Sequence, residues 1–98
     1  MIRFSDLSQL ANDCNESIAR KGHVNLFVKA AGCIVELQCT DCTLDTGCLE
    51  LSNEDNANGL CIEEGAFTSF YYDDETRIYD LEYDENGEYN ELSVRIVE

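Results

Sequence analysis

Apolar residues recur at helical spacing near the N-terminus of the chain. They lie three or four residues apart, on what would be one face of an α-helix, and are Leu7, Leu10, Ala11, Cys14 and Ile18. Ser5 is a suitable N-cap residue, and Gly22 suits the position that follows a last helical turn. The pattern predicts a helix over residues 5–21.

After Gly22 the pattern changes to short runs rich in β-branched, aromatic and aliphatic residues, separated by Gly, Asn and Asp. Such runs are typical of strands joined by turns. The predicted strands cover 24–29, 32–39, 48–51, 60–63 and 66–72. Within the second run, every other residue is apolar and is predicted to face the core: Cys33, Val35, Leu37 and Cys39.

The pair Asn86-Gly87 favours a two-residue type I′ turn and therefore a β-hairpin. This turn fixes the register, with Glu85 opposite Glu88 and Leu81 opposite Leu92. One face of the hairpin, with Tyr79, Leu81, Leu92 and Val94, is predicted to face the core. Acidic residues dominate the other face, on which Glu82 lies opposite Glu91. The sequence thus predicts an α+β fold, in which an N-terminal helix packs on an antiparallel β-sheet, a meander of about six strands.

The chain has 98 residues, of which 44% are hydrophobic, and this favours a single folded domain over 1–98. Its formal net charge is −15 and is unevenly distributed. Residues 1–49 hold six acidic and four basic residues (net −2), whereas residues 50–98 hold 15 acidic and two basic residues (net −13). This surplus argues against direct binding to nucleic acid or an anionic membrane, and favours a basic protein partner.

Carboxylates and tyrosines in the acidic half form the predicted partner-binding surface. Alternate residues on one strand face lie about 6.6–6.8 Å apart, a pitch comparable to that of phosphates along a nucleic-acid strand. A protein that holds nucleic acid with Lys and Arg would attract such a row. The predicted residues are Asp73, Asp74, Glu75, Asp80, Glu82, Asp84, Glu85, Glu88, Glu91, Tyr72 and Tyr89.

Size, charge and the runs Tyr71–Glu75 and Tyr79–Glu85 resemble those of small, acidic, phage-encoded inhibitors of host defence. Anti-CRISPR proteins and anti-restriction DNA mimics are examples. The resemblance implies an inhibitor that occupies a nucleic-acid-binding surface of a defence complex in the host cytoplasm. An immunity protein against a basic nuclease toxin is an alternative based on the same electrostatics.

Six cysteines without an apolar leader segment favour a reducing, cytoplasmic compartment and buried free thiols. Cys39 and Cys42 form a C-x-x-C motif, so a small zinc-binding or redox module is a further alternative. Its zinc ligands would be Cys33, Cys39, Cys42 and Cys48. No cofactor is expected in the main interpretation. Since His23 is the only histidine and no catalytic constellation is evident, the chain is predicted not to be an enzyme.

Overall fold

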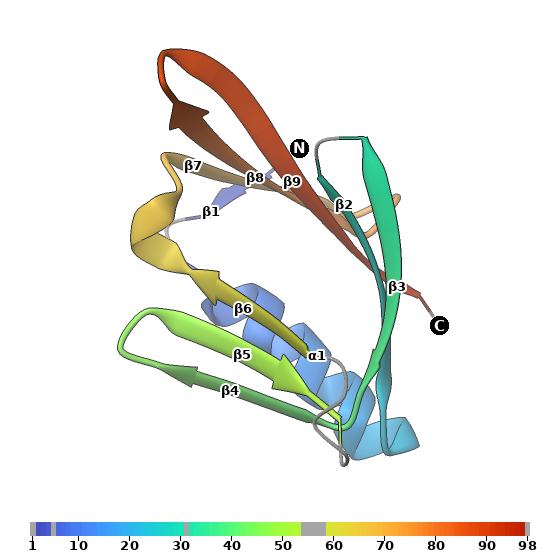
Figure 1. Cartoon of the computed structure of the whole chain (residues 1–98). Coiled ribbons are helices and arrows are strands. Elements are labelled where there is room, and N and C mark those ends of the chain that lie inside the picture. The colour runs from blue at the N-terminus through green and yellow to red at the C-terminus, as the bar shows by residue number, and fades with distance from the viewer. Residues whose placement is uncertain (1, 5, 31, 54–58, 98) are drawn as a thin grey trace.

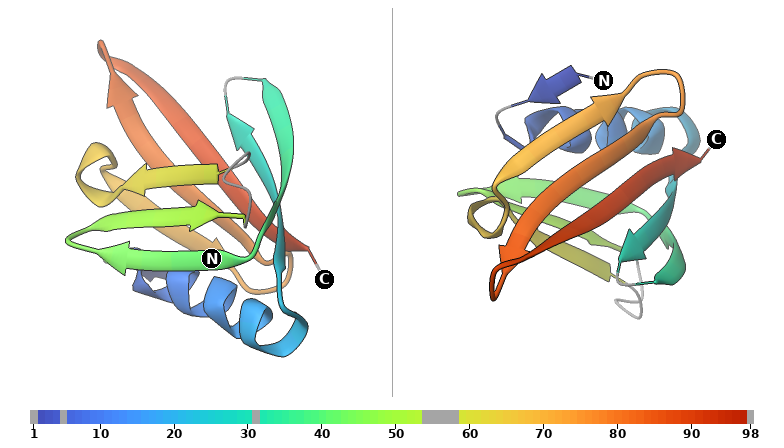
Figure 2. Two further views of the ribbon diagram at one scale, coloured as in Figure 1. Left: turned by 60° about the horizontal axis from the view of Figure 1, so that its bottom comes forward. Right: turned by 90° about the horizontal axis from the view of Figure 1, so that it is seen from above.

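A computed structural model describes residues 2–4, 6–30, 32–53 and 59–97 of the chain. The elements form two layers (Figure 1). The first is an antiparallel sheet with the strand order β1 (Ile2–Phe4), β7 (Ser69–Asp73), β8 (Ile78–Glu85), β9 (Glu88–Val97), β2 (Val24–Ala30) and β3 (Cys33–Cys39). The second holds helix α1 (Ser8–Lys21) beside a three-stranded antiparallel sheet of β4 (Asp41–Asp45), β5 (Cys48–Ser52) and β6 (Gly59–Glu63) (Figure 2).

The predicted α+β class is confirmed, with the N-terminal helix packed on an antiparallel sheet. The strands divide between two sheets, however, and the predicted single meander is replaced by two shorter ones, β4–β5–β6 in the small sheet and β7–β8–β9 in the large sheet. The chain leaves the large sheet after Cys39, and the amide of Thr40 donates to the carbonyl of Ser52 at 2.9 Å. β4 follows directly and lies beside α1 (Figure 2).

The helix has the predicted apolar face but begins later than predicted. Leu10, Ala11 and Cys14 are buried, whereas the first helical residue is Ser8. The carboxylate of Asp6 accepts a hydrogen bond from the Ser8 amide at 2.9 Å, which lowers the pKa of Asp6. The predicted cap residue, Ser5, lies outside the described residues.

The helix ends as predicted. Gly22 adopts a left-handed conformation, with φ of 84°, and its amide donates to the carbonyl of Ile18 at 2.7 Å. A residue with a side chain would be strained there, and glycine is not. The glycine therefore lets the chain reverse into β2, whose inward side chains Val24, Leu26 and Val28 are buried.

The register of the last hairpin is confirmed. Glu85 lies opposite Glu88 and Glu82 lies opposite Glu91. Asn86 and Gly87 have φ of 54° and 81°, as a type I′ turn requires. The inward side chains of β8 and β9 supply the centre of the core, where Tyr79, Leu81 and Val94 are fully buried.

Two predictions about β3 and β7 are wrong. Val35 is half exposed and Cys33 is exposed, because the end of β3 that holds them runs beyond the second layer (Figure 1). Only Cys39, at the opposite end of the strand, is buried. β7 begins at Ser69 instead of Ala66, since residues Glu64–Ala66 form a short 3-10 helix after β6.

A hydrogen bond joins the helix to the centre of the large sheet. The hydroxyl of Tyr79, on β8, donates to the carboxylate of Asp13, on α1. The ring of Tyr79 also packs on Tyr72, with ring centroids 4.4 Å apart. Burial and the carboxylate raise the pKa of Tyr79, so the phenol stays protonated and remains the donor.

Replacing Tyr79 with Phe should therefore lower the free energy of unfolding by about 1.5–3 kcal/mol, since the bond has a charged acceptor. Asp13→Asn keeps an acceptor oxygen and should cost less. Urea denaturation followed by circular dichroism measures both values. Equal stability of the wild type and Tyr79→Phe would contradict a stabilising role for this bond.

Candidate protein-binding interface

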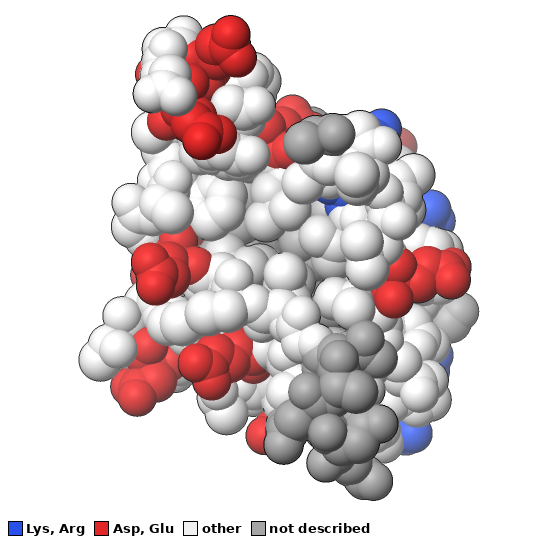
Figure 3. All heavy atoms as spheres, viewed as in Figure 1, with Lys and Arg blue, Asp and Glu red and all other residues white. Residues whose placement is uncertain are grey.

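The β8–β9 hairpin extends beyond the strands on either side of it. β7 pairs with β8 only as far as Glu82, and β2 pairs with β9 only from Leu92. Among the described residues, 83–91 therefore pair only within the hairpin and form a two-stranded projection (Figure 1). We call residues 82–91 the hairpin tip. Red spheres gather on this projection at the top of Figure 3. The acidic residues of the tip are Glu82, Asp84, Glu85, Glu88 and Glu91.

Tyr89 lies between the two carboxylates that face each other across the strands of the tip. Its hydroxyl donates to Glu82 and lies 3.5 Å from the carboxylate of Glu91. The bond to Glu82, with smaller contributions from desolvation and from both negative charges, raises the pKa of Tyr89 to about 12. The shared hydroxyl thus offsets part of the repulsion between like charges placed opposite each other.

The base of the tip is held by the segment that precedes β7. Both the amide and the hydroxyl of Thr68 donate to the carbonyl of Glu82, at 2.8 and 3.2 Å. The ring of Phe67 packs edge-on against Tyr83, with centroids 5.7 Å apart. These contacts fix the direction in which the tip leaves the sheet.

The charge of the outer face of the large sheet changes along β8. Asp80 is half-buried and accepts a hydrogen bond from Ser93 at 2.7 Å. The register places Lys29 and Arg3 in the same cross-strand row, each two strands from Asp80, or about 9.5 Å. Arg95 lies in the next row, farther from the tip. The predicted acidic row is thus bordered by basic residues at Asp80 and free of them from Glu82 outward.

Asp73, Asp74 and Glu75 do not join this surface. They lie in or next to the β7–β8 turn, and the Asn86-Gly87 turn is at the opposite end of β8. The eight residues of β8 separate the two groups by about 23 Å. The carboxylate of Asp73 also accepts hydrogen bonds from the amides of Glu75 and Thr76, at 3.0 and 3.4 Å, and so stabilises its own turn.

The two predicted tyrosines differ in position. Tyr89 is 65% exposed and belongs to the tip. Tyr72 packs on the fully buried Tyr79 and is directed toward the core side of the sheet. Of the predicted interface residues, the structure therefore brings together Glu82, Asp84, Glu85, Glu88, Tyr89 and Glu91.

The four cysteines proposed as zinc ligands are not brought together. Cys33 is exposed at one end of β3, whereas Cys39 is buried at the other end. Cys42 is buried near α1, where its sulfur lies 4.0 Å from the carbonyl of Ala11. Cys48 alternates with the inward Leu49 and so lies on the outer face of the three-stranded sheet. Cys42 and Cys48 therefore lie on opposite faces of the three-stranded sheet.

Three of the cysteines form a buried thiol cluster instead. Cys14 of α1 hydrogen bonds with Cys42, and this contact, followed by burial, raises the pKa of Cys14. Burial also raises the pKa of Cys39. These environments keep both thiols protonated, as expected for cysteines that serve as small apolar core residues.

A further contact between two cysteines was not predicted from the sequence. Cys48 and Cys61 lie on neighbouring strands with their sulfur atoms 3.2 Å apart. Both cysteines lie on strands that the sequence predicted, 48–51 and 60–63. The pairing of these two strands with each other, and the register that sets the two sulfur atoms side by side, were not predicted.

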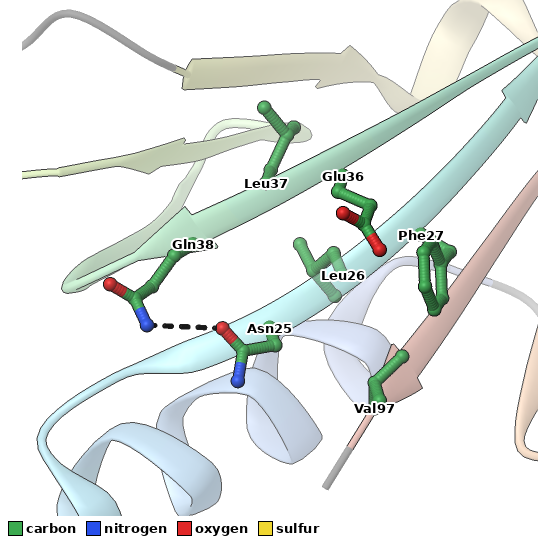
Figure 4. A pocket seen from close by; sticks show the side chains of 7 residues that line it. All are labelled: Asn25, Leu26, Phe27, Glu36, Leu37, Gln38 and Val97. Carbon is green, nitrogen blue, oxygen red and sulfur yellow. Dashed lines mark hydrogen bonds between the residues drawn. The ribbon is translucent and has the colours of Figure 1, made fainter.

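A shallow hollow lies on the outer face of β2 and β3 (Figure 4). The amide of Gln38 donates to Asn25 across the two strands at 3.2 Å. Phe27 and Glu36 form the next cross-strand pair. Glu36 is the single ionisable side chain in this lining, which therefore offers no acid–base pair.

Thiol accessibility should follow these positions. In the folded protein, alkylation should modify the exposed Cys33 and Cys61 first. Cys14, Cys39 and Cys42 should react only after unfolding, since all three are buried. Peptide mass spectrometry over a time course measures the order, and rapid modification of Cys39 or Cys42 in the native state would contradict the buried cluster.

The tip hydrogen bond should be visible in an alkaline titration. Tyr89 has a raised pKa, so its stabilising contact should be complete below pH 10 and lost as the pH rises toward about 12. Tyrosinate absorbance of the wild type should contain a component near pH 12 that Tyr89→Phe lacks, whereas the buried Tyr79 should stay protonated beyond that pH in both proteins. Tyr71→Phe, on the same face outside the tip, is the control. An unchanged component near pH 12 in Tyr89→Phe would contradict the raised pKa of Tyr89.

The comparisons with known proteins give no relative for this chain. No protein-family model matches it, and no curated protein or solved structure does so. Within the part of the chain that the structure describes, no helix is both long and apolar enough to cross a membrane. An assignment of function therefore rests on the charge and geometry of the chain itself.

Proposed function

We propose that this protein is a binding protein that inserts its acidic hairpin tip into a basic, nucleic-acid-binding surface of a protein partner. The observation that carries the proposal is the hairpin tip, which holds five carboxylates and from residue 83 projects beyond the neighbouring strands. No basic residue occurs in the sequence between Arg77 and Arg95. The tip is thus an anionic ribbon of uniform sign.

The shape of the tip supports docking into a groove. A two-stranded ribbon is narrow and exposes both of its faces. Glu82, Asp84 and Glu91 occupy one face, while Glu85 and Glu88 occupy the other near the turn. A groove lined by Lys and Arg would meet negative charge on both walls, and such complementarity speeds encounter and fixes orientation.

The tip also carries a contact suited to an interface centre. Tyr89 is held by Glu82 and exposes much of its ring. Its position is partly fixed before binding, so little side-chain entropy would be lost in a complex. Tyrosine is enriched at energetically important interface positions for this reason and for its combined apolar and polar character.

The biological class that fits this chemistry is an inhibitor that competes with nucleic acid, of the kind that acts on CRISPR effector complexes or restriction enzymes. In this role the carboxylates of the tip replace phosphates. Basic residues two strands from Asp80 would then border the contact and limit the part of the sheet that enters the groove.

A displacement assay tests the proposal. Labelled DNA is bound to purified CRISPR effector complexes and, separately, to restriction endonucleases, and the protein is titrated in. For its target, the wild type should displace the DNA, with an inhibitory concentration that rises as salt is added, because the contact is between charges. Glu85→Lys/Glu88→Lys should raise that concentration by about tenfold or more.

Asp41→Lys/Asp45→Lys is the matched control. It makes the same change in net charge at exposed positions of β4, away from the tip, and should displace DNA nearly as well as the wild type. Circular dichroism verifies that both variants fold. Equal losses for the two variants would show that bulk charge is responsible, and displacement insensitive to salt would overturn the electrostatic basis. Failure to displace DNA from every enzyme in both classes would overturn the proposed targets.

A further inference from the structure

The outer face of the three-stranded sheet gathers sulfur and carboxylate ligands. Cys48, Glu50 and Cys61 each place one potential ligand atom within 4.8 Å of the others. They come from two strands: Glu50 lies directly opposite Cys61, and Cys48 is two residues before Glu50. Glu63 lies opposite Cys48 and adds a second carboxylate to the same face.

We infer that Cys48, Glu50 and Cys61 form a surface site for zinc or a similar thiophilic divalent cation. The donor set is two thiolates and one carboxylate, which zinc accepts in a tetrahedral arrangement. The remaining position would be taken by Glu63 or by water. This site is separate from the hairpin tip, so the inference is independent of the proposed binding function.

The distance between the sulfur atoms favours a metal over a disulfide. Two thiolates bonded to one zinc at about 2.3 Å stand about 3.8 Å apart in a tetrahedron. In a disulfide they are about 2.05 Å apart. The observed 3.2 Å needs the smaller adjustment to reach the metal geometry.

The strand register also favours a bound metal over a disulfide. Cys48 and Cys61 are diagonal and not directly opposite each other. Diagonal neighbours in an antiparallel pair have Cα atoms about 7–8 Å apart, whereas disulfides usually span about 4.4–6.8 Å. A metal tolerates the wider spacing because it adds two bonds between the sulfur atoms.

The charge of the site also favours a cation. Glu50 and Glu63 lie beside the two thiols on the same strand face. A divalent cation held by the two sulfur atoms would offset the repulsion between these neighbouring carboxylates. Binding releases both thiol protons to solvent, so affinity should increase with pH.

A metal bound at this site would link β6 to β5. β6 is an edge strand, paired with β5 alone among the described elements. A metal held by ligands from both strands stabilises only the paired, folded state, and therefore raises the melting temperature. Half-buried Cys48 and exposed Cys61 and Glu50 leave the site open to metal from solvent.

Cobalt titration of the reduced, full-length protein without oxygen tests the inference. The expected result is one Co²⁺ per chain, with thiolate-to-cobalt absorbance and tetrahedral ligand-field bands, and its displacement by Zn²⁺. Cys48→Ser and Cys61→Ser should each remove the thiolate absorbance, and Glu50→Gln should weaken binding by about tenfold or more. The apparent Kd should fall by up to about 100-fold per pH unit between pH 6 and 7, since two protons are released.

Cys33→Ser is the matched control, because Cys33 is an exposed cysteine on the other sheet, and it should bind cobalt like the wild type. Glu85→Lys/Glu88→Lys should also bind normally, which separates this test from that of the hairpin tip. Three outcomes would overturn the site: no thiolate absorbance, absorbance that persists in Cys48→Ser/Cys61→Ser, or native mass spectrometry of the reduced protein with zinc that gives only the bare chain mass.

Discussion

The register of β9 is the constraint on which the rest of this structure depends. β9 pairs with β8 on one side and with β2 on the other, so it joins the C-terminal hairpin to the chain that follows the helix. The Asn86-Gly87 turn sets this register, and a slip of one residue would exchange the two faces. Val94 would then leave the core, and the carboxylate of Glu91 would be directed inward. The apolar core and the acidic surface are therefore two results of a single alignment.

The surplus of negative charge is distributed so that its cost to folding is low. The acids of the tip are carried by a ribbon without a second layer beneath it, where solvent screens their repulsion. Where carboxylates approach more closely, hydroxyl groups intervene: Tyr89 lies between Glu82 and Glu91, and Ser93 donates to Asp80. The carboxylate of Asp13 is likewise used by the buried Tyr79. Local donors at these three places offset part of the burden of a net charge of −15.

The parts of the fold that were predictable from sequence are those with a strong local signal. The apolar face of α1 follows from spacing, its end follows from Gly22, and the hairpin register follows from Asn86-Gly87. The second sheet was not predictable in the same way, because β4 has five residues and only Cys42 is buried. Its pairing with β5 depends on packing against α1, which no local pattern reports.

The candidate site was predictable to a similar extent. The alternation of Asp80, Glu82 and Asp84 on one face follows from strand periodicity. The separation of Asp73 from the tip follows from the length of β8 and was missed because acids close in sequence were treated as one surface. The exposure of Cys33 and Val35 depends on how far the second layer extends, and this is a property of the assembled fold. The Cys48–Cys61 pair likewise needs the strand alignment of the small sheet.

A projection that pairs only with itself has a consequence for how this protein can change over generations. Apart from the turn and Tyr83, most side chains of residues 83–91 are exposed, and none of these residues pairs with a described residue of β7 or β2. Substitutions at such exposed positions usually alter stability by less than about 0.5 kcal/mol. The tip can therefore acquire or lose charge while the rest of the molecule is retained. In evolutionary terms, the scaffold and its recognition element are free to diverge at different rates.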